Sequence, residues 1–275
     1  MTKKEIEEQE EKGLISVIDQ SGVELAIEKL ISKNNSLLPN NIAIERIKSS
    51  AGFYISNRQD LMELNGKEKM QMLFGVLKEA MMGCEAGVDY DIVPFKGKPV
   101  VCRKKEGWWK IIDLIKPAEI VRFTTNVIVK GDNYKFNPVT EELHHEMLAT
   151  SDKYEDIVGS YAYVRFANGF EKTIFMSKKD LDAIRKVSPS ASSSYSPWTT
   201  QPIKMVKTKT TKELAKELFT LYSGRVNSRL ARAIDSDEQS VEKIDENGNI
   251  INDNAVYEAK VIEHKEPEVV DLNNL

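Results

Sequence analysis

The feature that most constrains the fold is a long segment in which apolar and polar residues alternate. Over residues 119–130, Val121, Phe123, Val127 and Val129 are separated by polar side chains. Successive side chains of a strand point to opposite faces, so this pattern predicts a strand with one buried face and one polar face. A second strand is predicted at 157–166, and Asn168-Gly169 is typical of a tight turn into a third at 172–176. Together they predict an antiparallel sheet.

Helical periodicity predicts most of the remaining elements. Apolar residues three and four apart predict helices at 21–31, 39–55 and 67–83. A short hairpin is expected at 90–94 and 99–103, one or two helical turns at 108–115, and helices at 177–187 and from about 200 to 222. The expected class is α+β: a small antiparallel sheet and hairpins packed on a long basic helix, with an N-terminal helical region and an acidic C-terminal tail.

Charge is distributed unevenly along the 275 residues, whose net charge is −4. Residues 235–275 hold twelve acidic residues and three lysines, and residues 1–12 hold five glutamates and three lysines. Subtracting both ends leaves +7 for residues 13–234, and a basic body is typical of nucleic-acid binding. We expect a frayed charged terminus at 1–20, one folded domain at 21–234, and an acidic linker with a C-terminal element at 235–275.

Several classes of function lack their sequence signature. No run of 18 apolar residues and no secretory signal is present, so we expect a cytoplasmic protein that does not enter membranes. No phosphate-binding loop of the Gly-x-x-x-x-Gly-Lys-Ser/Thr type occurs, which argues against an ATP-driven motor. Cys84 and Cys102 are expected to be small buried apolar residues. We expect no cofactor, no metal and no catalysis.

Two alternatives to a binding function remain open. Asp89 and Asp91 lie two apart in a predicted strand and are the candidate carboxylates of a metal-dependent nuclease. His144 and His145 are neighbours that would face opposite sides of a strand, which disfavours shared metal ligation. The other alternative is a non-catalytic scaffold whose basic surfaces bind acidic proteins.

Two basic segments are the candidate interface. Residues 95–122 carry a net charge of +5 and residues 200–234 a net charge of +6. Cations interleaved with aromatic rings suit single-stranded nucleic acid, because phosphates bind the cations and free bases stack on the rings. The candidate contact residues are Phe95, Lys96, Lys98, Arg103, Lys104, Lys105, Trp109, Lys110, Arg122, Lys204, Lys207, Lys209, Lys212, Lys216 and Arg225.

A helical wheel sharpens the second segment. Lys209, Lys212 and Lys216 fall within roughly 60° of one another, opposite the apolar side, and form either a solvated face or a track for phosphates. Lys207 falls on the apolar side, so either the helix begins after it or its ammonium group faces a ligand. Trp108 and Trp109 diverge by about 100° on a helix, so one of them is expected in the core.

Six short motifs, in consistent order between about Met70 and Tyr222, resemble the RecT family of phage and prophage single-strand annealing proteins. The motifs are the helix 73–85 before Gly87; Val93-Pro94-Phe95; Trp109-Lys110-Ile111-Ile112-Asp113-Leu114; residues 129–132; Gly159-Ser160-Tyr161-Ala162; and Pro197-Trp198 followed by Met205, Lys207 and Lys209-Thr210. The family often has glycine where this chain has Ile111, and the Trp108-Trp109 pair is also a departure. A contact role therefore transfers more directly to Lys110 than to Trp109.

The resemblance implies a function and partners. It implies binding of single-stranded DNA and ATP-independent annealing of complementary strands, through a duplex intermediate held on an oligomeric filament or ring. The partners it implies are further copies of the chain, an exonuclease of the RecE type and the host single-strand DNA-binding protein. The tail after Asp235 would contact partners or compete with DNA. We expect the segment 96–110 to form one wall of a DNA groove and the segment 204–216 the other.

Overall fold

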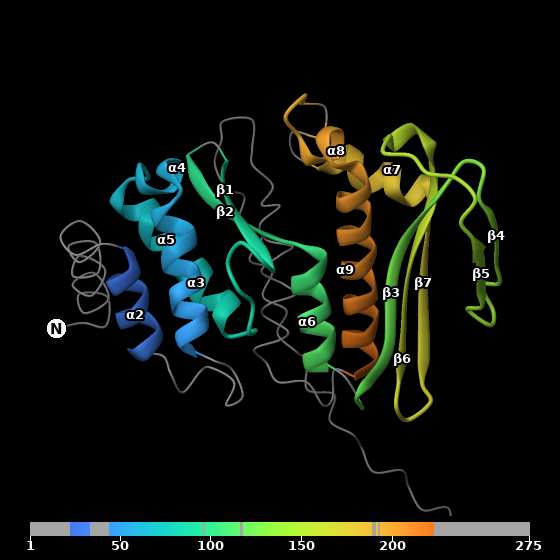
Figure 1. Cartoon of the computed structure of the whole chain (residues 1–275), viewed down its shortest axis with the longest axis horizontal. Coiled ribbons are helices and arrows are strands. Elements are labelled where there is room, and N and C mark those ends of the chain that lie inside the picture. Colours follow the sequence, from blue (N-terminus) through green and yellow to red (C-terminus); the bar gives the residue numbers. More distant parts are fainter. Residues whose placement is uncertain are drawn as a thin grey trace, which may run out of the picture. The chain divides into compact units, whose positions relative to one another are not determined.

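The computed structural model describes residues 23–33, 44–95, 97–115, 118–188, 191 and 193–222 (Figure 1). Helices and small antiparallel sheets are combined in this part of the chain, which confirms the α+β class. The predicted terminal parts, 1–20 and 235–275, lie outside the described residues. No helix of the described residues has the length and apolar character needed to cross a membrane.

Within residues 23–33 and 44–80, the structure has four helices: α2 (Val23–Lys33), α3 (Ile44–Ser56), α4 (Gln59–Met62) and α5 (Gly66–Ala80). The sequence predicts three of them, and the four-residue α4 is too short for a periodic pattern. Asn65 caps α5: its side chain accepts from the Glu68 backbone N–H, and the Glu68 side chain accepts from the Asn65 backbone N–H. The buried apolar residues of α5 join those of α2 and α3 in one core.

A short hairpin and a helix follow. Strands β1 (Tyr90–Phe95) and β2 (Lys98–Arg103) pair antiparallel, as predicted, and Gly97 adopts a φ of 80° in the turn. Helix α6 (Lys105–Ile115) starts three residues before the predicted segment and buries Trp108 and Trp109. Gly107, in the first turn of α6, packs against the backbone of Asp89.

The main sheet has the order β3-β6-β7 and is antiparallel throughout. Its strands are β3 (Ile120–Val129), β6 (Ile157–Phe166) and β7 (Glu171–Ser177), which confirms all three predicted strands. Helix α7 (Lys178–Val187) follows, capped by Ser177. The structure also contains three elements that the sequence pattern does not predict. These are the hairpin of β4 (Asn133–Phe136) and β5 (Leu143–Glu146), a 3-10 turn at Tyr154–Asp156, and α8 (Pro197–Thr200).

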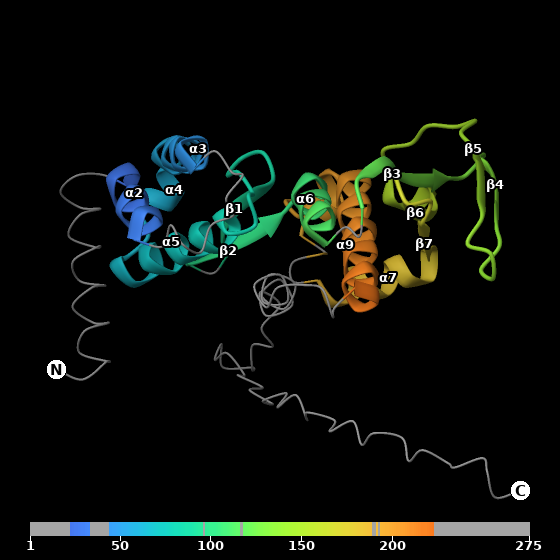
Figure 2. The ribbon, with the colours of Figure 1, turned by 90° about the horizontal axis from the view of Figure 1, so that it is seen from below.

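Helix α9 (Pro202–Tyr222) lies between α6 and the sheet (Figure 2). Its buried Leu214 and Leu218 share a core with Ala162, Val164 and Phe166 of β6. Two hydroxyl pairs fix its position, Thr210 with Ser160 at 2.5 Å and Thr211 with Thr125 at 2.9 Å. Because alternate residues of a strand face opposite sides, Thr124, Tyr161 and Tyr163 lie on the sheet face turned away from α9.

Replacing Gly107 with alanine tests the packing of α6. A Cβ at this position would meet the Asp89 carbonyl oxygen at 2.6 Å. Alanine gains about 1 kcal/mol in helix propensity, but a clash with backbone costs up to about 3 kcal/mol. We expect Gly107→Ala to lower the free energy of unfolding by about 1–2 kcal/mol, measured by urea denaturation. Gly169→Asn is the control: nothing lies within 4 Å and Asn tolerates the φ of 84°, so a smaller loss at Gly107 than at Gly169 would contradict the account.

Candidate nucleic-acid interface

Arg103 is turned into the protein interior. Its guanidinium pairs with the Glu79 carboxylate of α5 at 2.7 and 2.8 Å, and the two side chains are only 2% and 4% exposed. The same guanidinium lies 5.1 Å from the Trp108 ring centroid. A buried ion pair of this kind joins β2 to α5 and is closed to phosphate. A DNA contact by Arg103 stays a prediction, and in this structure its guanidinium is engaged by Glu79.

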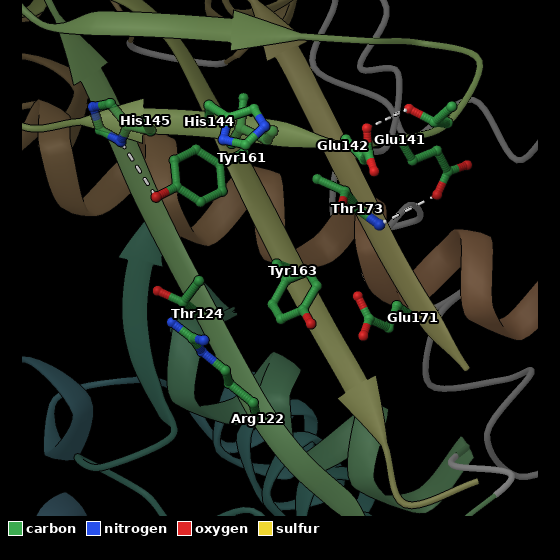
Figure 3. Close-up of a pocket in the computed structure, with 12 residues that line it drawn as sticks. Arg122, Thr124, Glu141, Glu142, His144, His145, Tyr161, Tyr163, Glu171 and Thr173 are labelled. Carbon is green, nitrogen blue, oxygen red and sulfur yellow. Dashed lines mark hydrogen bonds between the residues drawn. The ribbon is translucent and has the colours of Figure 1, made fainter. Parts of the chain in front are cut away.

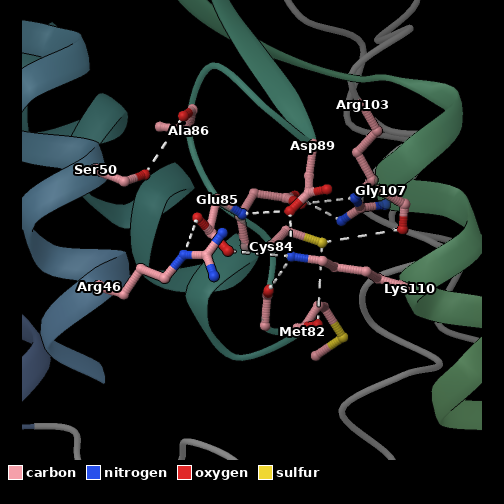
Figure 4. Close-up of polar contacts among 12 residues, drawn as sticks. Arg46, Ser50, Met82, Cys84, Glu85, Ala86, Asp89, Arg103, Gly107 and Lys110 are labelled. Carbon is pink, nitrogen blue, oxygen red and sulfur yellow. Dashed lines mark hydrogen bonds and ion pairs between the residues drawn. The ribbon is translucent and has the colours of Figure 1, made fainter. Parts of the chain in front are cut away.

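Acidic groups also engage Lys110 (Figure 4) and Lys104. The Lys110 ammonium group lies 2.5 Å from the Asp89 carboxylate and 3.5 Å from that of Glu85, and it donates to the Gly83 carbonyl. Partial burial lowers the pKa of Lys110, but its hydrogen bond to Asp89 and the nearby carboxylates outweigh this and raise it. Lys104 pairs with Asp91 at 2.9 Å and donates to the Gly87 carbonyl. Both lysines bind the loop before β1 to the start of α6.

The same contacts account for the two aspartates of the nuclease alternative. Asp89 is buried, and its carboxylate also accepts from the Glu85 backbone N–H at 2.7 Å. Asp91 faces a different lysine and accepts from the Tyr54 hydroxyl. Each carboxylate is balanced by its own ammonium group. In the part of the chain that the structure describes, no cluster of three or more His, Cys, Asp or Glu is arranged to hold a metal ion.

The three-lysine face of α9 is divided by its neighbours. Lys212 is only 8% exposed, because α6 packs over it and its ammonium group lies 5.7 Å from the Trp108 ring centroid. Lys209 and Lys216 are partly exposed, and Lys216 lies 3.6 Å from the Glu213 carboxylate. A continuous exposed track through all three lysines is therefore wrong. A wheel shows which residues share a side of a helix but not which neighbour covers that side.

Lys207 lies at the edge of the sheet. Helix α9 begins at Pro202, before Lys207, so Lys207 is helical and lies on the side of the helix that the wheel indicates. Its side chain is directed toward β3. Its ammonium group is 3.4 Å from the Asn126 side-chain oxygen. Burial lowers the pKa of Lys207, and the cation of Lys105 lowers it further. Of the described residues, no carboxylate forms an ion pair with Lys207, so this cation is partly desolvated without compensation.

An exposed ring lies beside this cation. Trp109, one helical turn beyond Lys105 on α6, is 8% exposed and packs against Phe123, with ring centroids 4.5 Å apart. Phe123 itself is 55% exposed. The ring open to a base is thus Phe123 and not the predicted Trp109. We call Lys105, Trp109, Phe123, Asn126 and Lys207 the β3-edge cluster.

The other predicted contact residues are scattered. Lys98 is exposed at the start of β2, Phe95 is partly exposed at the end of β1, and Lys204 is exposed near the start of α9. Arg122 is exposed on the sheet face away from α9. Lys96 and Arg225 lie outside the described residues.

A chain of polar contacts runs from the β3-edge cluster across that outer face. Asn126 donates to the Tyr161 hydroxyl at 3.3 Å, which lies 3.3 Å from the ring of His145, and the other ring nitrogen of His145 is 3.1 Å from Asp132 (Figure 3). Burial alone would raise the pKa of Asp132, but the N–H groups of Val129, Ala149 and Leu148 and the ring of His145 hold it well below its ordinary value. Both histidines lie on β5: His144 is exposed, whereas the side chain of His145 is buried against Tyr161 of the sheet.

Arg103→Ala tests the structural assignment of Arg103. Removing one partner of a buried ion pair leaves the other charge uncompensated, so we expect a loss of about 3–5 kcal/mol in the free energy of unfolding. Lys98→Ala, at an exposed position, is the control and is expected to change stability by less than about 0.5 kcal/mol. Chemical denaturation of both variants measures the difference. Equal stability of the two variants would show that Arg103 is not a structural anchor.

Comparison with known proteins identifies the family. A search of curated proteins finds no match to the chain. The model of the RecT family, whose members anneal single DNA strands in recombination, matches residues 92–251, which is more than half of the chain. The matched region includes β1 and β2, α6, the main sheet and α9. The chain therefore belongs to the RecT family.

Proposed function

We propose that this protein binds single-stranded DNA and anneals complementary strands without ATP, as an oligomeric filament or ring. The observation that carries the proposal is the environment of Lys207. This half-buried cation lies near a second cation, Lys105, and no carboxylate among the described residues forms an ion pair with Lys207. Desolvation and like-charge repulsion both disfavour this arrangement in the free protein. A phosphate group would relieve both, so the site favours a polyanion.

The chemistry of the β3-edge cluster suits a single strand of any sequence. Phosphates neutralised by lysine release counterions, and this gain does not depend on the bases. The exposed Phe123 ring offers a surface on which any base can stack. Sequence selection is then left to Watson–Crick pairing with the second strand, which is what annealing requires.

The cations fall into two groups in this proposal. The phosphate-binding group consists of the exposed Lys98, Arg122 and Lys204 and the half-buried Lys105 and Lys207. Lys105 also lies 3.4 Å from the Glu106 carboxylate. Lys209, Lys216 and Phe95 complete the group, together with Lys96 and Arg225 in segments that are not described. Arg103, Lys104, Lys110 and Lys212 hold the fold. The proposed partners are further copies of the chain, an exonuclease of the RecE type and the host single-strand DNA-binding protein, with residues 235–275 as their contact. The proposed location is the cytoplasm.

The salt dependence of binding tests this division. One lost phosphate contact lowers the slope of log affinity against log salt by about 0.7 for a single strand. We expect Lys105→Ala and Lys207→Ala each to lower the slope by about this amount, and Lys110→Ala to leave it unchanged because Asp89 engages that ammonium group. Fluorescence anisotropy of a labelled oligonucleotide at several salt concentrations measures the slopes. A slope that falls with Lys110→Ala and not with Lys207→Ala would refute the assignment.

The same preparation separates the alternative functions. Complementary oligonucleotides mixed with the protein without ATP are expected to form duplex faster than oligonucleotides alone. Degradation of a labelled strand in Mg²⁺ or Mn²⁺ would favour the nuclease. Absence of oligonucleotide binding at physiological salt would favour the scaffold.

The pH dependence of binding gives an independent check on Lys207. Phosphate binds the charged ammonium form, so affinity is constant well below the pKa of Lys207 in the free protein and falls as pH rises through it. Because that pKa is lowered, the fall begins at lower pH than for an ordinary lysine. Lys207→Arg, which stays charged, is expected to abolish the early fall. An identical profile for the wild type and Lys207→Arg would contradict the proposed contact.

A further inference from the structure

The outer face of the main sheet carries a cavity that the β3-edge cluster does not include. Its volume is about 470 Å³, within the size range of small-ligand pockets. The floor is formed by β3, β6 and β7, and the β4–β5 hairpin closes one end (Figure 3). Phe136 of the hairpin stacks on Phe175 of β7 with centroids 4.9 Å apart, and His145 meets Tyr161 edge-on at 5.5 Å. These contacts hold the hairpin over the sheet.

The two tyrosine rings of the floor, Tyr161 and Tyr163, differ in how much the hairpin covers them. The Tyr161 hydroxyl is engaged by Asn126 and His145, and its ring lies beneath the hairpin. Tyr163, the next residue on the same face, is half-buried, and no ring stacks on it among the described residues. Burial and a hydrogen bond to Glu171 raise the pKa of Tyr163, and the nearby cations of Arg165 and Arg122 oppose this rise. The floor therefore presents an open ring beside a cation.

Some of the charged side chains that line the cavity form ion pairs and others do not. Glu171 is paired with Arg165 at 3.3 Å, and Glu141 with Lys172 at 2.6 Å. Arg122 and Glu142, in contrast, form no ion pair with any residue that the structure describes. The cavity thus offers a cation and a carboxylate that have no ion-pair partner among the described residues, on either side of an aromatic floor; the Glu142 carboxylate accepts from the Thr140 hydroxyl, at 3.3 Å. A ligand that joins an anion, a flat ring and amine donors would satisfy all three.

We propose that this cavity binds an unpaired nucleobase of the DNA strand whose phosphates lie on the β3-edge cluster. The base stacks on Tyr163, its exocyclic amine donates to Glu142, and the adjoining phosphate pairs with Arg122. Asn126 joins the two sites, since it contacts Lys207 on one side and Tyr161 on the other. This inference rests on the proposed DNA binding and adds a second, base-recognising site to it.

General recognition chemistry supports this occupant. Antiparallel sheets with aromatic residues on an open face stack the bases of single strands in other proteins. A carboxylate accepts from the exocyclic amine of cytosine, and thymine has no such amine. The proposed site therefore distinguishes a stacked base from a bare phosphate backbone, and cytosine from thymine.

The central test compares Tyr163→Leu with Tyr163→Phe, which keeps the ring. Affinity is measured by anisotropy with an oligo-dC strand and with a strand of equal length made of abasic sites. We expect Tyr163→Leu to bind oligo-dC at least about fivefold more weakly than wild type, at an unchanged salt slope, and to bind the abasic strand as wild type does. Tyr163→Phe is expected to retain the affinity for oligo-dC.

A second variant tests the carboxylate. We expect Glu142→Gln to reduce the ratio of oligo-dC affinity to oligo-dT affinity relative to wild type. An unchanged ratio would remove Glu142 from the site.

The outcomes separate this inference from the proposed function. Wild-type protein that binds oligo-dC while Tyr163→Leu binds it equally well would overturn the nucleobase site and leave DNA binding intact. Equal weakening of the oligo-dC and abasic strands by Tyr163→Leu would also overturn it, because the loss would then not involve bases. Wild-type protein that binds neither strand would overturn the proposed function itself.

Discussion

The arrangement of this protein depends on the pairing of buried charge. An ionised side chain taken out of water requires a partner, and Glu79 and Asp89 supply one to Arg103 and Lys110. The first pair holds the β1–β2 hairpin against α5, and the second holds α6 against the loop before β1. Helix α6 then packs on α9, and this contact brings Lys105 within reach of Lys207. The cations that are paired internally therefore position those that are left for phosphate.

The position of Lys207 links the fold to the proposed DNA binding. It is half-buried because α9 packs on the sheet and its side chain is directed toward the edge strand β3. Among the described residues it is near an amide oxygen and a second cation but no carboxylate. A protein selected only for stability gains nothing from this arrangement, whereas a protein that binds a polyanion does. Through Asn126 and Tyr161 the same lysine is linked to the outer face of the sheet, where Arg122 and Tyr163 lie. Phosphate contact and base contact can thus be made from one edge strand.

Much of the fold could be predicted from the sequence, because hydrophobic periodicity reports local structure directly. Strand β6 begins and ends where the alternation does, and the Asn168-Gly169 turn joins it to β7. The β4–β5 hairpin was missed because its four-residue strands are mostly exposed and carry little alternation. For the site, charge alone could not separate Lys110 from Lys105, since their difference lies in an aspartate that is distant in sequence. The sequence did single out Lys207, because it is a cation on the apolar side of its helix. Phe123 fits the alternation of a strand, but that alternation does not show that its ring is exposed.

We propose that the cations divide into a structural group and a DNA-binding group. Acylation of lysines with and without saturating oligo-dC, read by mass spectrometry, tests this division. DNA is expected to protect Lys105, Lys204 and Lys207 and to leave the modification of Lys104, Lys110 and Lys212 unchanged. Protection of Lys110 and Lys212 with no protection of Lys207 would contradict it.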